Sequence, residues 1–440
     1  MPLLNESGRL AKRFRYLAVF LLFSLALVKF VFQDMRTLAF QFNDLTTPWV
    51  ATQTFLHGMN PYNDINEFDR IWASTRIPLP ASCPDYRCIL ATYQSIYPPT
   101  ALALIAPLGL LPWHAAVYTY VAGSTAFFAF ALLVLAQRLP LPWNDVRKLY
   151  FVAFALAMAP LHSGIHEANL NTLVVAFLCA GMGLLANRPY GSGIAIAMAM
   201  CLKPQVGIFF FAYPWLRKKW RAAFASLGAC TFVSACSLIW LNIHHVEWFG
   251  AFLSQLSQFS APGGRSGVEA PGPGKFQLLN LQILTFQLTH SREWSAILAW
   301  IVFALLAGVA IYLIHRRVSD ENESTGIAIV AVLTLLPVYQ RFYTAEVLLF
   351  VLYWAVENCD LRRAKAALLL MVALLFPFAA WTERSGIAMR FTEGNHTGLD
   401  VIWNDFLMPH MIWIELLLLL ILIADLSTQA QRLPDGQVPA

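Results

Sequence analysis

The chain has few charged residues, since Asp, Glu, Lys and Arg make up only 12% of its 440 residues. A soluble domain has about 25% charged and about 45–50% apolar residues, whereas 58% of this chain is apolar and its mean hydropathy is +0.58. The shortage of charge excludes a soluble domain and predicts an all-α, polytopic membrane protein. The net charge of +5 does not indicate a nucleic-acid partner, because the Lys and Arg residues form short clusters between apolar runs, as orientation signals do.

The sequence also lacks the motifs of soluble enzymes. It has no G-x-G-x-x-G motif, no phosphate-loop lysine motif, no nucleophile elbow and no C-x-x-C pair. The acids of "NDINEFD" (63–69) include no D-x-D pair, so neither a metal ion nor another cofactor is expected. Of the seven cysteines, only Cys83 and Cys88 lie in a predicted outer loop. They either form a disulfide or remain two free thiols packed in that loop.

Ten apolar stretches are predicted to cross the membrane, because about 20 apolar residues span a bilayer and fewer are enough for a helix embedded among others. These stretches are residues 16–32, 113–135, 149–161, 169–186, 222–241, 296–314, 325–338, 347–356, 366–381 and 411–423. Two further stretches, 97–111 and 191–216, are interrupted by proline, the second at Lys203-Pro204. We interpret both as re-entrant, since broken backbone at membrane depth needs protein or a wet cavity around it.

The positive-inside rule orients this arrangement. With both termini in the cytoplasm and both broken stretches returning to their starting side, all the basic clusters face inward. Three large soluble pieces, 34–96, 244–294 and 382–409, then lie outside. The sequence therefore predicts one membrane domain, residues 1–426, with a cytoplasmic tail at 427–440. Its N-terminal apolar run is interpreted as a retained helix, because no small-residue cleavage site follows it.

The stretch "FNDLTTPWVATQTFLHGMNPYN" (42–63) follows the first span. Trp49, Thr52 and Phe55 are spaced as on a helix, which predicts an amphipathic helix along the outer membrane surface that ends before Gly58. Asp44 stands just ahead of it and has two interpretations. It is either the N-cap of this helix, a position that Asp favours, or a catalytic carboxylate on the outer face.

Two basic residues are candidates for binding an anion. Lys203 lies within an apolar segment, where a charge costs at least about 2.5–3.5 kcal/mol unless it faces a partner or a wet cavity. It either binds a ligand in the outer-facing cavity, or reaches the surface or a buried acid. Arg341, in "PVYQRFYTAE" (337–346), lies between two short apolar segments and is the second candidate.

An acid after the first helix is followed by "HGMNPY" (57–62), "YPP" (97–99), "GIHEANLNTL" (164–173), and "LKPQ" (202–205) ahead of a basic "RKKWR" (217–221). This ordered series of motifs, over roughly residues 16–360, resembles glycosyltransferase family 87. The family consists of polyprenyl-phosphate-mannose-dependent mannosyltransferases with the C-type glycosyltransferase fold. The resemblance implies a multi-pass enzyme of the bacterial cytoplasmic (inner) membrane, with its active site on the extracytoplasmic face.

The implied reaction is an inverting transfer of a hexose, mannose by the resemblance, from a polyprenyl-phosphate donor to a lipid or glycan acceptor. Asp44 matches the general base, which takes the proton of the attacking hydroxyl. The phosphate leaving group needs cations rather than an acid, a role for Lys203 and Arg341. The candidates for binding substrate are Tyr62, Tyr97, His166, Glu167, Asn169 and Tyr343, although Asn169 could equally cap its helix.

Other classes of membrane protein share some of these features. A polymerase or ligase of lipid-linked glycans uses the same donor lipid and face, but would be expected to carry its key groups in one large late loop. A lipid or glycan transporter also uses broken helices and buried cations, yet the two halves show no internal repeat. A non-catalytic assembly partner is a further alternative.

Overall fold

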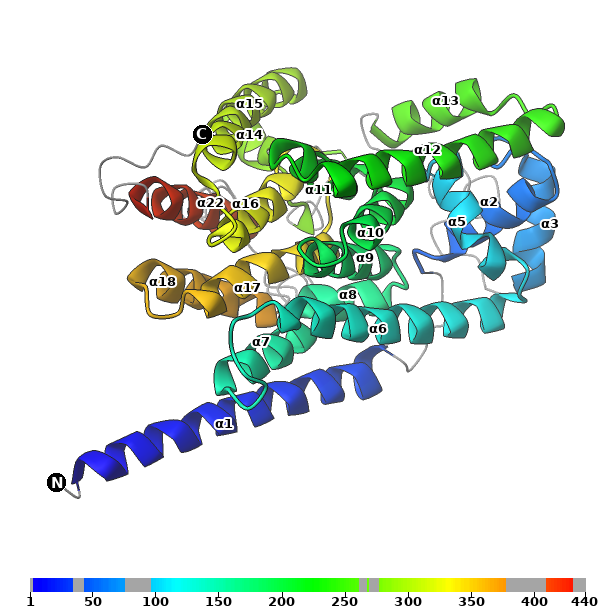
Figure 1. The fold of residues 1–440 in the computed structure, drawn as a ribbon. Helices are drawn as coiled ribbons and strands as arrows, with labels where there is room; N and C mark the ends of the chain where they lie inside the picture. Colours follow the sequence, from blue (N-terminus) through cyan, green and yellow to red (C-terminus); the bar gives the residue numbers. More distant parts are fainter. Residues whose placement is uncertain are drawn as a thin grey trace, which may run out of the picture.

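A computed structural model of the chain describes residues 3–34, 43–75, 96–260, 267–268, 277–376 and 409–429. Within these ranges the protein is helical, with one isolated β-bridge between Leu278 and Arg341, in agreement with the predicted all-α class (Figure 1). The elements are α1 (Leu3–Lys29), η1 (Phe30–Asp34), α2 (Thr46–Leu56), α3 (Ile65–Thr75), α5 (Pro99–Gly109), α6 (Trp113–Gln137), α7 (Val146–Ala157), α8 (Ala159–His166), α9 (Asn171–Leu184), α10 (Pro189–Leu202), α11 (Pro204–Leu216), α12 (Trp220–Ile243), α13 (Trp248–Ser260), α14 (Leu281–Thr289), α15 (Arg292–Arg317), α16 (Glu323–Leu335), η3 (Phe342–Leu348), α17 (Leu349–Glu357), α18 (Arg362–Met371), η4 (Val372–Leu375) and α22 (His410–Gln429).

Six helical segments of the described residues are long and apolar enough to cross a membrane. They are Arg13–Phe32, Trp113–Gln137, Val146–His166, Trp220–Ile243, Arg292–Arg317 and His410–Thr428, and each overlaps a predicted span. The other four predicted spans fall on α9, α16, α17 and α18, which have 14, 13, 9 and 10 residues; residues 377–381 of the last one lie outside the described ranges. The polytopic membrane class is therefore supported, and the count of ten spans stays a prediction.

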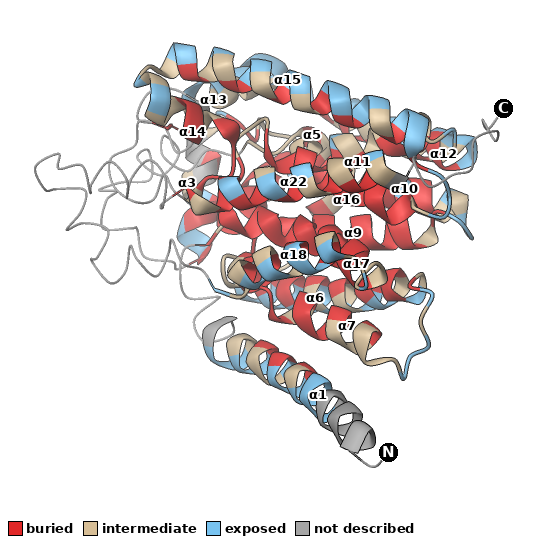
Figure 2. Cartoon of the chain, turned by 90° about the vertical axis from the view of Figure 1, so that its left-hand side faces the viewer, coloured by how far each residue is buried: buried red, intermediate tan, exposed pale blue. Residues whose placement is uncertain are grey.

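The core consists of short helices enclosed by long ones. Every residue of α16 is buried, and so is α17 from Leu349 to Val356. Figure 2 shows this buried centre, with α9, between α15 on one side and α6 and α1 on the other. The long helices expose large apolar side chains on their outer faces, among them Phe20, Phe130, Phe232 and Leu305. Such faces suit contact with lipid rather than water.

The segment from α10 to α11 returns to the end of the molecule from which it starts. The Arg138 guanidinium donates to the Met182 carbonyl, near the end of α9, and pairs with Glu323 at 2.6 Å. Lys219, just after α11, lies 3.9 Å from the same Glu323 carboxylate. One end of the bundle therefore holds both the beginning and the end of this segment. Along the chain, the break at Lys203 lies between this beginning and this end, so the chain turns back there, as the re-entrant interpretation requires.

The other broken stretch, 97–111, is less divided than its prolines predicted. It forms one helix, α5, with Pro99 in its first turn and Pro107 inside it. Pro99 fits there because the first turn of a helix needs no N–H donor. With 11 residues, α5 is about 16 Å long, about half the thickness of the apolar layer of a bilayer.

The prediction of an amphipathic surface helix after Asp44 is wrong. Helix α2 is buried on nearly all sides, and Trp49, Thr52 and Phe55 are each less than 5% exposed. Thr52 fits this environment because its hydroxyl donates to the Pro48 carbonyl at 2.7 Å. The predicted end at Gly58 is confirmed, since α2 stops at Leu56 and Gly58 takes φ +70°, a conformation that favours glycine.

Candidate active site

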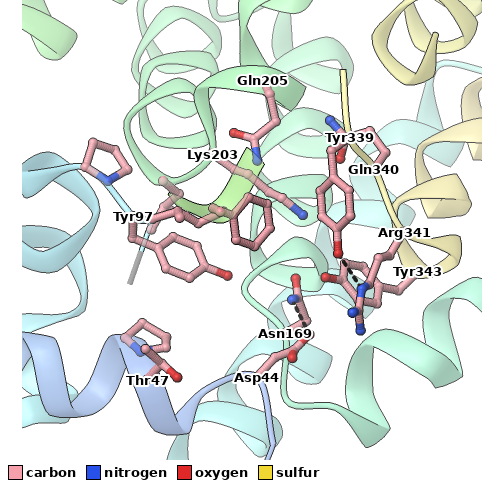
Figure 3. A pocket seen from close by; sticks show the side chains of 15 residues that line it. Asp44, Thr47, Tyr97, Asn169, Lys203, Gln205, Tyr339, Gln340, Arg341 and Tyr343 are labelled. Carbon is pink, nitrogen blue, oxygen red and sulfur yellow. Dashed lines mark hydrogen bonds between the residues drawn. The ribbon is translucent and has the colours of Figure 1, made fainter. Parts of the chain in front are cut away.

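Breaks between helices bring together side chains that are far apart in the sequence. Asp44 precedes α2, Asn169 lies between α8 and α9, Lys203 separates α10 from α11, and Arg341 precedes η3. All four line one cavity, and a few polar groups that converge in a cavity are typical of a small-molecule site. Figure 3 shows Lys203 entering from the side opposite Asp44, with Arg341 beside Tyr343. The lining residues are Asp44, Thr47, Pro48, Ile96, Tyr97, Pro98, Asn169, Leu202, Lys203, Gln205, Phe259, Tyr339, Gln340, Arg341 and Tyr343.

Asp44 is held in place by the chain that leads into α9. Its backbone N–H donates to the Glu167 carbonyl at 2.8 Å, and its carboxylate accepts a hydrogen bond from Asn169 Nδ2 at 2.8 Å. Asp44 does not cap α2, whose N-cap is Leu45 without a side-chain bond. The turn is closed by Asn43 instead, because the Asn43 side chain accepts from the Leu45 N–H at 3.1 Å. The capping interpretation of Asp44 is therefore not observed.

Asn169 is presented by a tight turn at the end of α8. Ala168 has φ +47°, and the Asn169 N–H donates to the Gly164 carbonyl at 2.9 Å, a hydrogen bond that closes many helix ends. Tyr120 on α6 donates to the Asn169 carbonyl at 2.6 Å. The Asn169 side chain acts at both of its ends, since its oxygen accepts from the Asn171 N–H at 2.9 Å while its nitrogen donates to Asp44. The Asn169 side chain therefore contacts the first residue of α9 and the Asp44 carboxylate at the same time.

Lys203 stands where the helix breaks. Pro204 cannot continue α10, because its ring takes the place of a hydrogen-bonded N–H, so α11 begins there. Gly207 allows the sharp return, since a Cβ at this position would lie 2.5 Å from Met200 Cα. The Lys203 side chain is 6% exposed, and its amine lies 5.0 Å from the centre of the Tyr343 ring. A buried ammonium over an aromatic face in a cavity is placed to receive an anion.

Arg341 lies on an extended segment that pairs with Leu278. The Leu279 N–H donates to the Gln340 carbonyl at 2.9 Å, which fixes this segment against the start of α14. The Arg341 Nε donates to the Tyr339 hydroxyl at 2.5 Å. Together with Lys203, it gives the cavity two cations facing one carboxylate. Such a site can bind a phosphate and accept a proton at separate places.

Three of the predicted substrate-binding residues do not line this cavity. Tyr62 is 1% exposed and donates to the Tyr97 carbonyl at 2.9 Å, so it supports Tyr97, which does line it. His166 ends α8, and Glu167 contributes the carbonyl that binds Asp44.

The sequence prediction missed other lining residues. Some of them are neighbours of predicted residues in the same motifs, namely Pro98, Gln205, Tyr339 and Gln340.

A second cavity adjoins the first. Ile96, Gln205, Phe259 and Tyr339 line both cavities, whereas neither Asp44 nor Asn169 lines the second. Gln205 follows Lys203 by two residues and Tyr339 accepts a hydrogen bond from Arg341. The second cavity therefore adjoins the site near the two cations, although neither of them lines it. Its wall reaches α15 at Trp300, and its other lining residues are Leu256, Gly267, Val268, Asn280, Gln282, Arg292, Glu293, Ala296, Pro337 and Val338.

The described residues contain no group of three or more His, Cys, Asp or Glu side chains that could hold a metal ion. Glu67, an acid of the "NDINEFD" segment, forms ion pairs with Arg70 and, at 2.8 Å, with His57. The hydrogen bond from Arg70 is the main reason why the pKa of Glu67 is lowered. The expectation that no metal or cofactor is needed stays a prediction. Cys83 and Cys88 lie outside the described residues.

Comparison with known proteins adds a family match. The model of glycosyltransferase family 87 matches residues 96–338, more than half of the chain. Tyr97, Asn169 and Lys203 lie inside the matched region, whereas Asp44 and Arg341 lie outside it.

Two curated proteins are similar over a shorter stretch. Both are named alpha-(1->3)-arabinofuranosyltransferase and come from two strains of Mycobacterium tuberculosis, CDC 1551 / Oshkosh and ATCC 25618 / H37Rv. Each is 26% identical over 147 residues, which are 32% of this chain and 34% of the relative. The similarity thus spans about a third of these relatives. No solved structure matches the chain.

Proposed function

The chain belongs to glycosyltransferase family 87, and from this premise we propose that it transfers one sugar from a polyprenyl-phosphate donor to a lipid or glycan acceptor. One observation carries this proposal, namely a single cavity in which the carboxylate of Asp44 faces the two cations Lys203 and Arg341. The cations suit the phosphate of the donor, and the carboxylate suits the acceptor hydroxyl.

The proposed reaction is a single displacement with inversion at the anomeric carbon. The acceptor oxygen forms the new bond to this carbon, and its proton passes to Asp44. The bond from the anomeric carbon to the phosphate oxygen breaks, and the polyprenyl phosphate leaves with the electron pair. Lys203 and Arg341 stabilise the charge that develops on this leaving group. Because a phosphate leaves without being protonated, the reaction needs no acid residue at that side.

The second cavity supports a lipid as the part of the donor beyond the phosphate. It adjoins the site at Gln205 and Tyr339, which neighbour the two cations in the sequence, and most of its lining residues are apolar. Trp300 is 52% exposed on α15, a helix long and apolar enough to span the membrane. In this proposal the prenyl chain runs from the phosphate along this cavity toward the bilayer.

Mannose is the sugar that the family resemblance implies, and arabinofuranose is the alternative that the name of the curated relatives favours.

We place the reaction on the extracytoplasmic face of a bacterial inner membrane, because the cavity lies away from the basic end formed by Arg138 and Lys219. Positively charged ends of membrane proteins face the cytoplasm.

The test is to offer the purified protein polyprenyl-phosphate mannose, arabinofuranose and glucose, with GDP-mannose for comparison, and to measure the sugar transferred or released. We expect one lipid-linked sugar to be used and the nucleotide sugar to be refused. Use of GDP-mannose alone would contradict a lipid donor, and addition of a preassembled glycan block would favour the polymerase or ligase alternative.

A variant pair tests the binding of the donor phosphate. Lys203→Ala removes a charge-assisted contact, typically worth about 1.5–3 kcal/mol, so we expect donor affinity to fall about 10- to 100-fold. Lys365→Ala is the matched control. Lys365 lies on α18 and lines neither of these two cavities, so this substitution should not change donor affinity. Equal affinity of the two variants would return Lys203 to a structural role.

A further inference from the structure

A buried asparagine behind the cavity connects its two charged sides. Asn171 is the first residue of α9 and is fully buried. It does not line the cavity, so it does not touch a ligand there. Its backbone nevertheless contacts the side of the site that holds Asp44, and its side chain contacts the side that holds Lys203.

On the acid side, Asn171 acts through its backbone. Its N–H donates to Asn169 Oδ1 at 2.9 Å. An amide side chain has one accepting end and one donating end, so this bond turns the Asn169 NH₂ group toward Asp44, to which it donates at 2.8 Å. The first peptide of α9 thereby sets which group of Asn169 meets the Asp44 carboxylate.

On the cation side, Asn171 acts through its side chain. Its Oδ1 accepts from Lys203 Nζ at 3.4 Å, while its Nδ2 donates to Glu346 Oε2 at 3.3 Å and to the Tyr343 carbonyl at 3.2 Å. Only the oxygen can face an ammonium, and only the NH₂ group can face a carboxylate and a carbonyl. The amide therefore has a single favourable orientation.

This amide also separates two opposite charges. Lys203 and Glu346 are both buried, at 6% and 1% exposure, and a buried cation needs a nearby anion. A direct ion pair would hold the ammonium against Glu346 and compete with any incoming phosphate. With Asn171 bonded to both groups, the Glu346 carboxyl group and the Lys203 ammonium do not meet directly, and the ammonium remains directed at the cavity.

We propose that Asn171 is a positioning residue, oriented by Glu346, that holds the lysine for the donor phosphate and the aspartate for the acceptor proton in one hydrogen-bonded chain. This inference rests on the proposed function, because it assigns Lys203 to the donor phosphate. It predicts unequal effects on the two sides, since replacing the Asn171 side chain leaves its backbone N–H in place for Asn169.

The first experiment uses Asn171→Leu, which has a similar size and no polar side-chain atoms. We expect the KM for the lipid-linked sugar to rise about 10- to 100-fold, the loss expected for a hydrogen bond to a charged group. We expect kcat to fall less than about tenfold, because Asn169 and Asp44 keep their contacts. Thr172→Val is the matched control. Thr172 donates to the same Glu346 carboxylate at 3.5 Å, but within the described residues its side chain forms no hydrogen bond with Lys203 or Asn169. The KM of this variant should therefore change less than about threefold.

Binding of undecaprenyl phosphate to the protein in nanodiscs gives a readout that does not require turnover. Asn171→Leu should weaken this binding by the same factor as it raises KM. Asn171→Asp, which keeps the shape of the side chain, should weaken it at least about tenfold, because the introduced carboxylate pairs directly with Lys203. This second variant tests the proposal even where the leucine variant does not fold.

Failure of the two proposals can be told apart. A wild-type protein that binds undecaprenyl phosphate and transfers no sugar from any donor would refute the proposed function, and the binding series would still test Asn171. Binding of undecaprenyl phosphate within about threefold of wild type in both Asn171 variants would overturn the positioning role, as would an equal loss in Thr172→Val.

Discussion

Replacing Asp44 by Asn isolates the chemical role of its carboxylate. The oxygen of the new amide can accept the hydrogen bond from Asn169 Nδ2, which is 2.8 Å long in the wild type. The backbone bond to the Glu167 carbonyl is unaffected, and Asn43, not Asp44, closes the turn before α2. We therefore expect the variant to fold and to bind the donor. What it loses is the ability to accept a proton at this position.

The size of the expected loss follows from that role. A general base typically contributes about 10²- to 10⁴-fold, so kcat should fall at least about a hundredfold with little change in donor affinity. Asn169→Ala keeps the carboxylate but removes the bond that orients it. Since a hydrogen bond to a charged group is worth about 1.5–3 kcal/mol, this second variant should lose about 10- to 100-fold in kcat/KM.

The assay is steady-state transfer from the lipid-linked sugar that the wild type uses, together with donor binding. Asn43→Ala is the control for the turn, because losing its hydrogen bond should lower stability by about 0.5–1.5 kcal/mol and leave kcat nearly unchanged. Near-normal transfer by Asp44→Asn would refute the assignment, and Glu346 or Glu167 would then have to be examined as the base. Loss of donor binding in Asp44→Asn would also contradict it.

Three further predictions concern packing, pH and topology. Gly193→Ala should lower stability by about 1–3 kcal/mol through overpacking, because the new Cβ would lie 2.3 Å from a backbone carbonyl oxygen of α12. Gly228→Ala, on α12 itself, is the control. A Cβ at Gly228 would have no atom within 4 Å, so this variant should be tolerated in the same melting assay. Glu67 has a pKa below its ordinary value of 4.5, so its contribution to stability is present above about pH 4.5 and is lost as the pH falls through the folded-state pKa. Glu67→Gln should therefore melt earlier than wild type at pH 7, the gap should close in acid, and a gap independent of pH would contradict the ion-pair explanation. Single cysteines placed at Tyr190 and Arg217, in a background without the native cysteines, should react with an impermeant thiol reagent only from the cytoplasmic side, and labelling of either from outside would rule out the re-entrant segment.

Lys203 was accessible from the sequence because a charge within an apolar stretch has to face a partner or a wet cavity. Asp44 was singled out by its place after the first span and by the family resemblance, and both residues line the same cavity. The break before Pro204 was equally local, since proline cannot continue a helix. The predictions for Lys203 and Pro204 needed only the identity of each residue and of its neighbours along the chain.

The sequence did not reveal that α2 is buried. Its threonines resemble the polar face of a surface helix, yet the hydroxyls of Thr52 and Thr54 donate to carbonyls one turn earlier, at 2.7 and 3.0 Å. Because such bonds satisfy a hydroxyl within its own helix, threonine can be buried as readily as it can face water. Whether a neighbouring element covers it depends on the rest of the fold.

The sequence by itself determined the membrane class, the family, the helix break at Lys203 and the charged groups that the site would need. Only the tertiary structure decided which atoms meet. Asn169 is 125 residues from the Asp44 that it orients, and Glu346 is 175 residues from the Asn171 that it binds. Local patterns report the cost of burying a group, whereas its partner is set by how distant helices pack, and no periodicity along the chain encodes that contact.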